Sequence, residues 1–365
     1  MEIATEVLVV GGGPAGSTAA AFLADKGIET ILLEKNPSNM KPCGGGIPSV
    51  AFEEFDIPEE QIIKEVDTIK LISPNDNAVA IKLDPQKICI VERMRFDSCL
   101  RGRAKALGAE LLKGEFIRTE KRKKAYLSKI IKDGVEIEIK SGYLIAADGV
   151  NSKVRLSQGL KPPPSIFAVT ERISDIKTEH CEFWLSSSHA QNFYSWVFPA
   201  ADGISAGTGG PEPRKIKYLL ETFKQRKRLN KYKGNTSIYR IPVWKGDLYN
   251  KGNIIFAGDS AGQVMPMSYE GIYYAMKSGE FAAEAIIKGD AARYRKIWKG
   301  SLYRKFLLMS ELNSYFLKND ANAEKLVSLH KNPKLQEAAK TLWLMKDPNS
   351  ESLQNYIKLL GKILI

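Results

Sequence analysis

Residues 6–16, EVLVVGGGPAG, decide the fold of this chain. An apolar, β-branched run leads into the pattern G-x-G-x-x-G at Gly11, Gly13 and Gly16, and a run of small residues suited to a helix follows. A second apolar run then ends at the acidic Glu34. Strand, glycine turn, helix, strand and acid in this order form a complete βαβ unit, which predicts a site for a dinucleotide cofactor.

Each glycine of this unit has its own expected task. Gly11 permits the tight turn, Gly13 lets the backbone approach a pyrophosphate, and Gly16 lets the helix pack closely on the strand. The helix N-terminus offers unpaired N–H groups to the phosphates, and Glu34 is expected to bind both ribose hydroxyls. The predicted cofactor-binding residues of the unit are Gly11, Gly13, Pro14, Ala15, Gly16, Glu34 and Lys35.

Two later stretches indicate which dinucleotide is bound. Residues 143–155, YLIAADGVNSKVR, and residues 253–262, NIIFAGDSAG, each read as a buried strand that ends in a turn with an aspartate. Both resemble motifs of FAD enzymes with the p-hydroxybenzoate hydroxylase fold. In that family the second aspartate caps the ribityl chain, and the next helix directs its N-terminus at the pyrimidine end of the isoalloxazine. The resemblance implies FAD rather than NAD, and adds Asp148, Asp259, Gly271 and Ile272 to the cofactor site.

Two further stretches narrow the family. Residues 41–48, KPCGGGIP, follow the βαβ unit, and residues 194–199, YSWVFP, lie in the middle of the chain. Together they look like the geranylgeranyl reductase family, flavoenzymes that saturate isoprenoid double bonds in archaeal membrane lipids, chlorophyll side chains and some quinones. The resemblance covers roughly residues 1–290 and rests on five motifs in the correct order. The exact isoprenoid substrate stays open.

The family resemblance also suggests residues near the flavin. Cys43, Gly44 and Gly46 would lie beside the isoalloxazine, where Cys43 is either a backbone ligand of the cofactor or a reactive, catalytic thiol. Arg93 precedes a Phe-Asp pair that opens a helix, and its guanidinium would donate to the phosphate or ribityl region. A plain ion pair is the alternative for Arg93. No other catalytic side chain is predicted.

Reduction of an isoprenoid needs few polar side chains. The protein must align an apolar chain over the reduced flavin and exclude water. The family resemblance points to an apolar tunnel, and the alternative is that its apolar residues are ordinary core. The residues proposed to line the tunnel are Tyr194, Trp196, Phe198, Met265, Met267 and Tyr269.

The motifs also predict the organisation of the chain. We expect an α/β protein: a discontinuous, Rossmann-like FAD-binding domain, an inserted antiparallel sheet of α+β character over the flavin, and a helical C-terminal region. The sheet is expected to include a hairpin formed by residues 69–72 and 78–83. The FAD-binding domain comprises residues 1–68, 88–160 and 241–290, the substrate domain residues 69–87 and 161–240, and the helical region residues 291–365.

Composition and length limit the function classes. The 365 residues are 44% hydrophobic and 26% charged, which is typical of a globular protein of two to three domains. No apolar run reaches the length of a membrane span, and no signal peptide is recognisable, so we expect a cytoplasmic enzyme. The four cysteines form no C-x-x-C pair and the three histidines show no ligand spacing with them, so no metal site is predicted.

The net charge of +12 raises the question of partners. Such a field attracts anions, so the expected partners are a lipid or phosphorylated substrate and, in peripheral contact, an anionic membrane. Solvated helix faces explain the charge equally well, and nucleic acid is not expected because no recognition fold is present. The first basic cluster is Arg214, Lys215, Lys217, Lys224, Arg226, Lys227, Arg228, Lys231 and Lys233, and the second is Arg293, Arg295, Lys296, Lys299, Arg304 and Lys305, with Tyr294, Trp298 and Tyr303 interleaved.

The electron donor and one rival activity stay open. The glycines of GTGG, residues 207–210, are followed by Pro-Glu-Pro, so they do not form a second dinucleotide cradle. The sequence does not identify the donor, and NAD(P)H bound transiently without a Rossmann domain and reduced ferredoxin both stay open. The main rival within the fold is a flavin-dependent monooxygenase that acts on an aromatic substrate. A halogenase is disfavoured because a W-x-W-x-I-P motif is absent.

Overall fold

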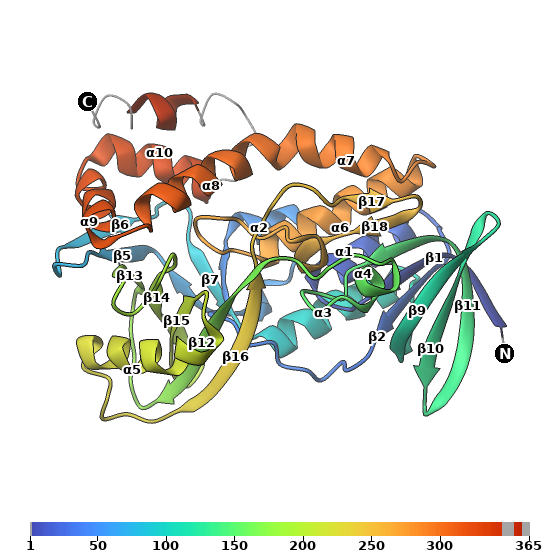
Figure 1. Ribbon diagram of the computed structural model, residues 1–365, viewed down its shortest axis with the longest axis horizontal. Coiled ribbons are helices and arrows are strands. Elements are labelled where there is room, and N and C mark those ends of the chain that lie inside the picture. Colours follow the sequence, from blue (N-terminus) through green and yellow to red (C-terminus); the bar gives the residue numbers. More distant parts are fainter. Residues whose placement is uncertain (1, 345–353, 360–365) are drawn as a thin grey trace. The chain divides into compact units, whose positions relative to one another are not determined.

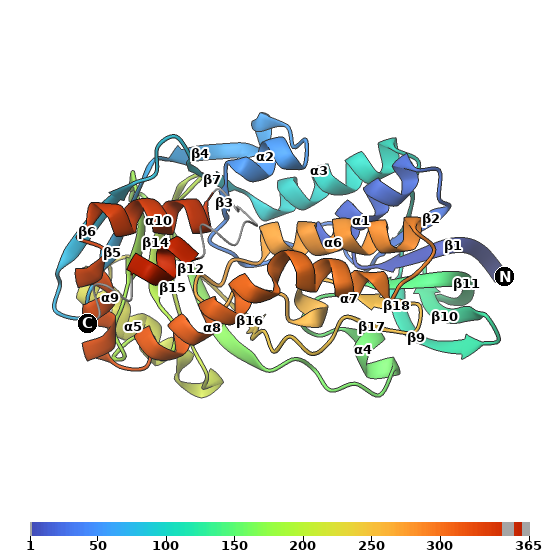
Figure 2. The same ribbon diagram turned by 90° about the horizontal axis from the view of Figure 1, so that it is seen from above.

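The computed structural model describes residues 2–344 and 354–359. The chain forms two compact units, drawn together in Figures 1 and 2. The first unit is Met1–Met40, Met94–Ser165 and Ile241–Phe306, and the second is Lys41–Arg93, Ile166–Arg240 and Leu307–Ile365. Residues 41–68, which the motifs assign to the FAD-binding domain, belong to the second compact unit. The boundaries of a functional FAD-binding domain stay a prediction, because compactness alone does not tell which residues hold the cofactor.

The first unit is built on a mostly parallel sheet. Its strands follow the spatial order β17 (Asn250–Lys251), β18 (Ile254–Phe256), β11 (Val135–Ala146), β1 (Glu2–Val10), β2 (Thr30–Glu34) and β8 (Glu110–Lys113). All neighbours run parallel except β17, and β10 (Ala125–Lys132) and β9 (Glu115–Arg122) extend β11 as an antiparallel ribbon. This is the open parallel sheet of a dinucleotide-binding fold, as the βαβ motif predicts.

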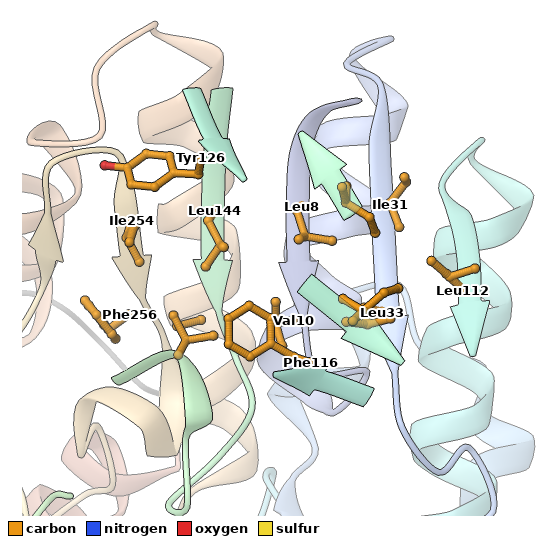
Figure 3. Packing of buried hydrophobic residues seen from close by; sticks show 14 of the residues in the cluster. Leu8, Val10, Ile31, Leu33, Leu112, Phe116, Tyr126, Leu144, Ile254 and Phe256 are labelled. Atoms are coloured by element: carbon orange, nitrogen blue, oxygen red, sulfur yellow. The ribbon is translucent and has the colours of Figure 1, made fainter. Parts of the chain in front are cut away.

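The core of the first unit lies on one face of this sheet (Figure 3). Leu8 and Val10 of β1 lie between side chains of the neighbouring strands, among them Leu144 and Leu33, and all of these are at most 4% exposed. Phe116 of the β9–β10 ribbon packs against the same cluster. Alternation along each strand places these apolar side chains together, because successive residues of a strand point to opposite faces.

The helices of the first unit are α1 (Pro14–Asp25), α3 (Arg93–Ala106), α4 (Lys153–Ser157), α6 (Ile272–Ile287) and α7 (Arg293–Trp298), with a 3-10 turn η3 (Gly258–Ala261) and a π-helical turn η4 (Lys299–Tyr303). Helices α1 and α6 lie side by side in both views (Figures 1 and 2). Their contact depends on Gly279, because a Cβ there would lie 2.2 Å from the carbonyl oxygen of Ala15. Helix α6 begins where the sequence predicts it.

The second unit contains a larger sheet with the strand order β16 (Asn235–Pro242), β12 (Ser165–Ser174), β15 (Gly203–Gly210), β14 (Ser195–Ala200), β13 (Cys181–Trp184), β5 (Thr68–Ile72) and β6 (Ala78–Lys82). The predicted hairpin is confirmed as β5–β6. The expectation of a wholly antiparallel sheet is wrong for one pair of strands, because β5 joins β13 in parallel. Those two strands are far apart in sequence, and a long crossover permits parallel pairing where a tight hairpin cannot.

The remaining elements of the second unit are a small sheet and helices. The small sheet pairs β3 (Gly46–Pro48), β7 (Ile88–Val91) and β4 (Ile62–Val66). The helices are α2 (Val50–Glu54), the 3-10 turns η1 (Glu59–Gln61) and η2 (Pro213–Lys215), α5 (Ile216–Lys227), α8 (Arg304–Phe316, which begins in the first unit), α9 (Asp320–Leu329) and α10 (Pro333–Trp343). The described residues beyond Gly289 form helices and the turns that join them, which confirms the predicted α/β class with a helical C-terminal region. Within the described residues, no helix combines the length and apolarity needed to cross a membrane.

Candidate functional site

The glycine turn of the first unit is held in place by Glu34. The backbone N–H of Gly12 donates to Oε2 of Glu34 at 2.7 Å, and the N–H of Asn36 donates to Oε1 at 2.7 Å. Each carboxylate oxygen keeps a further lone pair. The predicted contact of Glu34 with ribose hydroxyls is compatible with this geometry and stays a proposal, while its bonds to the glycine turn were not foreseen.

Two of the glycines have the packing roles that the motif predicts. Gly11 has a φ of +104°, and a Cβ there would lie 2.4 Å from the carbonyl oxygen of Ala147. A Cβ on Gly16 would lie 1.9 Å from the carbonyl oxygen of Gly11. Both positions therefore exclude a side chain, and they bring the turn and the start of α1 together.

Gly13 differs from Gly11 and Gly16, because its surroundings are open. A Cβ on Gly13 would meet no atom of the described residues within 4 Å. Gly13 is the N-cap of α1, no side chain caps the helix there, and no acidic residue lies in its first turn. Pro14 occupies the first helical turn and lacks an N–H, so the free donors come from the following residues, beginning with Ala15. Open space in front of uncapped N–H groups is what a pyrophosphate needs.

Arg101 of α3 is a residue of this site that the motif search missed. It is 8% exposed, and its guanidinium donates from Nη1 to the carbonyl of Gly12 at 3.0 Å and from Nη2 to the carbonyl of Pro37 at 2.7 Å. A Cβ on Gly12 would lie 2.8 Å from Cδ of Arg101, so the second glycine of GGG is required as well. The sequence signal, a lone arginine in a basic helix, does not single out Arg101.

Asp148 lies at the C-terminal end of β11 and caps the short helix α4. Its Oδ2 accepts from the N–H of Val154 at 3.0 Å, and burial raises the pKa of the carboxyl group. Within the described residues, Oδ1 of Asp148 is buried without a hydrogen-bond partner. Arg155 of α4 links this motif to the second aspartate motif by donating from Nη1 to the carbonyl of Ser260 at 2.8 Å.

The second aspartate motif lies beside the N-terminus of α6. Oδ1 of Asp259 lies 3.7 Å from the position of a Cβ on Gly271, which is the N-cap residue of α6. Among the residues that the structure describes, no side chain caps this helix, and its first turn, which begins at Ile272, has no acidic residue. A 16-residue helix presents a partial positive charge at this end. The structure thus brings together the four residues Asp259, Gly271, Ile272 and, across the α1–α6 contact, Ala15.

The turn before α6 contains the predicted residues Met265, Met267 and Tyr269, and Lys35 lies elsewhere in the first unit. Tyr269 has a φ of +53° in the left-handed region, and its N–H donates to the carbonyl of Met265 at 2.9 Å. Met265 is 2% exposed, whereas Met267 and Tyr269 are half-buried. Lys35 forms an exposed ion pair with Glu115 at 2.8 Å. Contacts of these residues with cofactor or substrate stay predictions.

In the second unit, strand pairing brings Arg93 to the glycine-rich loop. The N–H of Val91 donates to the carbonyl of Gly45 at 2.9 Å, and β3 and β7 continue this pairing from Gly46. Arg93, 4% exposed, follows β7 by two residues. The loop is turned by Gly45, with φ +79°, and the thiol of Cys43 accepts from its N–H at 3.3 Å. A catalytic role of Cys43 stays untested.

An aromatic face of β14 packs on this loop. A Cβ on Gly44 would lie 2.8 Å from the ring of Phe198 and 3.6 Å from Nε1 of Trp196. Tyr194 lies edge-on to Trp196, with 6.4 Å between ring centroids, and Phe183 of β13 lies edge-on to both Tyr194 and Phe198. The three predicted aromatic residues therefore share one cluster beside the loop.

The glycines of β15 make room for this cluster. A Cβ on Gly207 would lie 2.2 Å from Cζ2 of Trp196, and one on Gly209 would lie 2.4 Å from Cδ1 of Phe193. The GTGG stretch is therefore part of a central strand in which two glycines leave room for aromatic rings. Its glycines serve packing, in agreement with its exclusion as a nucleotide cradle.

The two basic clusters contain fewer free cations than the sequence suggests. In the first cluster, Lys224 is 3% exposed and pairs with Glu171 at 2.8 Å, Arg226 pairs with Asp76 at 2.7 Å, and Lys227 pairs with Glu182 at 2.7 Å. In the second cluster two of the three interleaved aromatic residues do not face outward, because Tyr294 and Trp298 are fully buried, whereas Tyr303 is half-buried. The exposed cations of the first cluster are Arg214, Lys215, Lys217, Arg228, Lys231 and Lys233.

These arrangements fit FAD. Within the described residues, the open space at Gly13 and two helix N-termini without a capping side chain offer room and N–H donors to the phosphates, and the unpartnered buried oxygen of Asp148 offers an acceptor to a hydroxyl group. Within the described residues, no group of three or more His, Cys, Asp and Glu side chains is arranged to hold a metal ion.

Comparison with known proteins agrees with the geometry. The family model described as FAD binding domain matches residues 4–288. The chain is 34% identical over 322 residues to chloroplastic geranylgeranyl diphosphate reductase of Oryza sativa, covering 82% of this chain and 70% of that protein. It is 33% identical over 341 residues to digeranylgeranylglycerophospholipid reductase of Methanocaldococcus jannaschii, covering 84% and 85%.

Solved structures show the same fold. A geranylgeranyl bacteriochlorophyll reductase-like protein of Thermoplasma acidophilum superposes with a TM-score of 0.87 at 26% identity, covering 98% of this chain and all of that one. The flavin-dependent brominase Bmp2, with a TM-score of 0.77 at 19% identity over 99% of this chain and 98% of that one, shares the fold alone. Because relatives that share a third of its residues span most of its length, the chain belongs to the geranylgeranyl reductase family of FAD-dependent oxidoreductases.

Proposed function

We propose that this protein is an FAD-dependent reductase that saturates isoprenoid double bonds of a lipid or prenylated substrate. The observation that carries the proposal is its 31–35% identity to reductases of geranylgeranyl diphosphate and geranylgeranylated phospholipid. Bound in its reduced form, FAD would supply a hydride to one carbon of the double bond, while a proton from a residue, water or the flavin itself would reach the neighbouring carbon. The protein binds the cofactor, aligns the apolar chain and excludes water.

The polar residues of the first unit serve the cofactor in this proposal. The turn at Gly11, Gly13 and Gly16 and the N–H groups of α1 hold the pyrophosphate, and Glu34 accepts from the ribose. Asp259 accepts from the ribityl hydroxyls. The N-terminus of α6 stabilises negative charge on the reduced flavin. Arg93, Gly44 and Gly46, which belong to the second unit, are further proposed contacts of the cofactor.

The aromatic cluster of the second unit serves the substrate in this proposal. Phe198 is half-buried against Gly44, so its ring borders the loop assigned to the flavin. Trp196 is 6% exposed and packs against Gly207, so it supports the neighbouring aromatic residues and offers little of its own ring for contact. Tyr194, Met265 and Tyr269 are the other proposed contacts of the apolar chain.

The reaction is tested with the FAD-loaded protein, reduced with dithionite under exclusion of oxygen. Geranylgeranyl diphosphate and a geranylgeranylated glycerophospholipid are expected to gain two hydrogens per saturated bond, which mass spectrometry detects. Phe198→Ala is expected to slow reduction while FAD affinity holds, since burial of a ring contributes about 1.5–3 kcal/mol. Tyr218→Ala is the matched control, because Tyr218 is 68% exposed on α5. Hydroxylation of a phenol in air, with every polyprenyl compound returned unreduced, would instead establish the monooxygenase.

The remaining parts of the proposal concern partners and location. The electron donor is NAD(P)H bound without a second cradle, or reduced ferredoxin, and stopped-flow reduction of the flavin by each distinguishes them. We place the enzyme in the cytoplasm, in peripheral contact with anionic membranes through the exposed cations of the first basic cluster, such as Arg214 and Lys217. Sedimentation with anionic vesicles that weakens as salt rises supports this contact.

A further inference from the structure

A buried polar network lies directly behind Asp259. Gly258, which precedes Asp259, has a φ of +63°, and its N–H donates both to Oε1 of Gln263 at 3.0 Å and to Oγ of Ser278 at 2.8 Å. The N–H of Gln263 donates back to the carbonyl of Gly258 at 3.0 Å. Tyr294 of α7 donates from its hydroxyl to the same Oε1 of Gln263 at 2.9 Å.

The orientation of the Gln263 amide follows from its partners. A backbone N–H can only donate, so the atom facing Gly258 is the amide oxygen, and Tyr294 must then be a donor as well. Gln263 is 1% exposed, and Ser278 and Tyr294 are fully buried. Within the described residues, Nε2 of Gln263 has no hydrogen-bond partner. An unpaired N–H donor in the interior lowers the stability of the fold. The presence of Gln263 therefore indicates a role for its amide oxygen, which holds the turn at Gly258.

The turn has little freedom on its other sides. A Cβ on Gly258 would lie 3.2 Å from Cβ of Ala15 in α1 and 3.3 Å from Cβ of Ala275 in α6. The turn is therefore wedged between the two helices whose N-termini form the candidate cofactor site. A shift of the Gly258 backbone changes the direction of the Asp259 carboxylate, because the two residues share a peptide bond.

We propose that Tyr294 is a positioning residue for the cofactor site, which acts through Gln263 and Gly258 to hold the Asp259 carboxylate in its binding geometry. Tyr294 lies beyond residues 4–288, which the FAD-binding family model matches. Helix α7 is thus a functional part of the cofactor site. The inference rests on the proposed role of Asp259 in FAD binding, and it does not depend on the substrate.

The test is a double-mutant cycle on FAD affinity. Tyr294→Phe removes one hydroxyl and is expected to raise the Kd for FAD about 3- to 10-fold, as the loss of one neutral hydrogen bond implies. The matched control is Tyr249→Phe, because Tyr249 lies in the same aromatic cluster, 6.3 Å from Tyr294 between ring centroids, and its hydroxyl has no partner within the described residues. This control is expected to leave the Kd unchanged.

The decisive measurement is made in an Asp259→Ala background. If Tyr294 acts through Asp259, Tyr294→Phe has no further effect on the Kd there, so the two changes are strongly non-additive. Additive effects would overturn the proposal, and so would an unchanged Kd in either single variant. Urea unfolding of the apoproteins separates binding from folding: a Kd effect that only mirrors a loss of apoprotein stability also overturns it. A protein that shows this cycle but reduces no polyprenyl compound refutes the proposed function and leaves the inference intact.

Discussion

Gly13→Val separates cofactor binding from folding more cleanly than any other change in the glycine turn. The backbone at Gly13 has φ −79° and ψ −172°, an extended conformation that valine adopts without strain, and in the described part of the chain a Cβ there meets no atom within 4 Å. The cost to the apoprotein is that of a poorer N-cap residue, about 0.5–1 kcal/mol. The same side chain would occupy the space of the pyrophosphate.

The size of the effect follows from ligand linkage. At a free FAD concentration of about 100 times the Kd, binding stabilises the wild-type protein by about 2.7 kcal/mol. Gly13→Val is expected to lose this entire increment while its apoprotein unfolds near the wild-type urea concentration. The assay is urea unfolding with and without FAD, together with fluorescence titration of the apoprotein.

Gly16→Ala is the contrasting variant. Its Cβ would lie 1.9 Å from the carbonyl oxygen of Gly11, so the apoprotein itself is expected to lose about 1–3 kcal/mol or more. If FAD stabilises Gly13→Val as much as the wild type, the pyrophosphate does not lie at Gly13 and the cofactor assignment of the turn is refuted. Equal destabilisation of the Gly13→Val and Gly16→Ala apoproteins would instead contradict the difference in packing between the two glycines.

Two further predictions concern the stability of the second unit. Lys224→Met is expected to lower the free energy of unfolding by about 3–5 kcal/mol, because it leaves Glu171 charged and buried. Lys227→Met breaks a partly exposed pair with Glu182 and is expected to lower the free energy of unfolding by about 1 kcal/mol or less. Equal urea midpoints for the two variants would contradict this. Burial, together with the nearby charge of Arg226, lowers the pKa of His189 to about 3, below the value of about 6.5 in the unfolded chain. The stability from neutral His189 is therefore complete above about pH 6.5 and is lost as the pH falls toward 3. The difference in the free energy of unfolding between the wild type and His189→Asn should shrink over that range. Parallel pH profiles of the two proteins would contradict this role of His189.

Several features of the first unit could be predicted from short stretches of the sequence. The order of strand, glycine turn, helix and acid in residues 6–34 specified the parallel pairing of β1 with β2, and the start of α6 at Ile272 followed from the family motif. These features depend on alternation, on glycine conformations and on helix termini, all of which are properties of a short stretch of chain. The β5–β6 hairpin was predictable for the same reason.

What the sequence by itself determined is the class of fold, the dinucleotide turn and the residue types around it. Only the tertiary structure revealed that Arg101 binds the carbonyl of Gly12 and that Gly207 makes room for Trp196. It also revealed that Lys224 forms a buried ion pair with Glu171. In the sequence Tyr294 is one of the aromatic residues interleaved in the second basic cluster, and in the structure it is buried and bonded to Gln263. The physical reason is the same in each case: these contacts join segments far apart in the chain, and the packing of whole strands and helices, which no local pattern encodes, decides which distant residues meet.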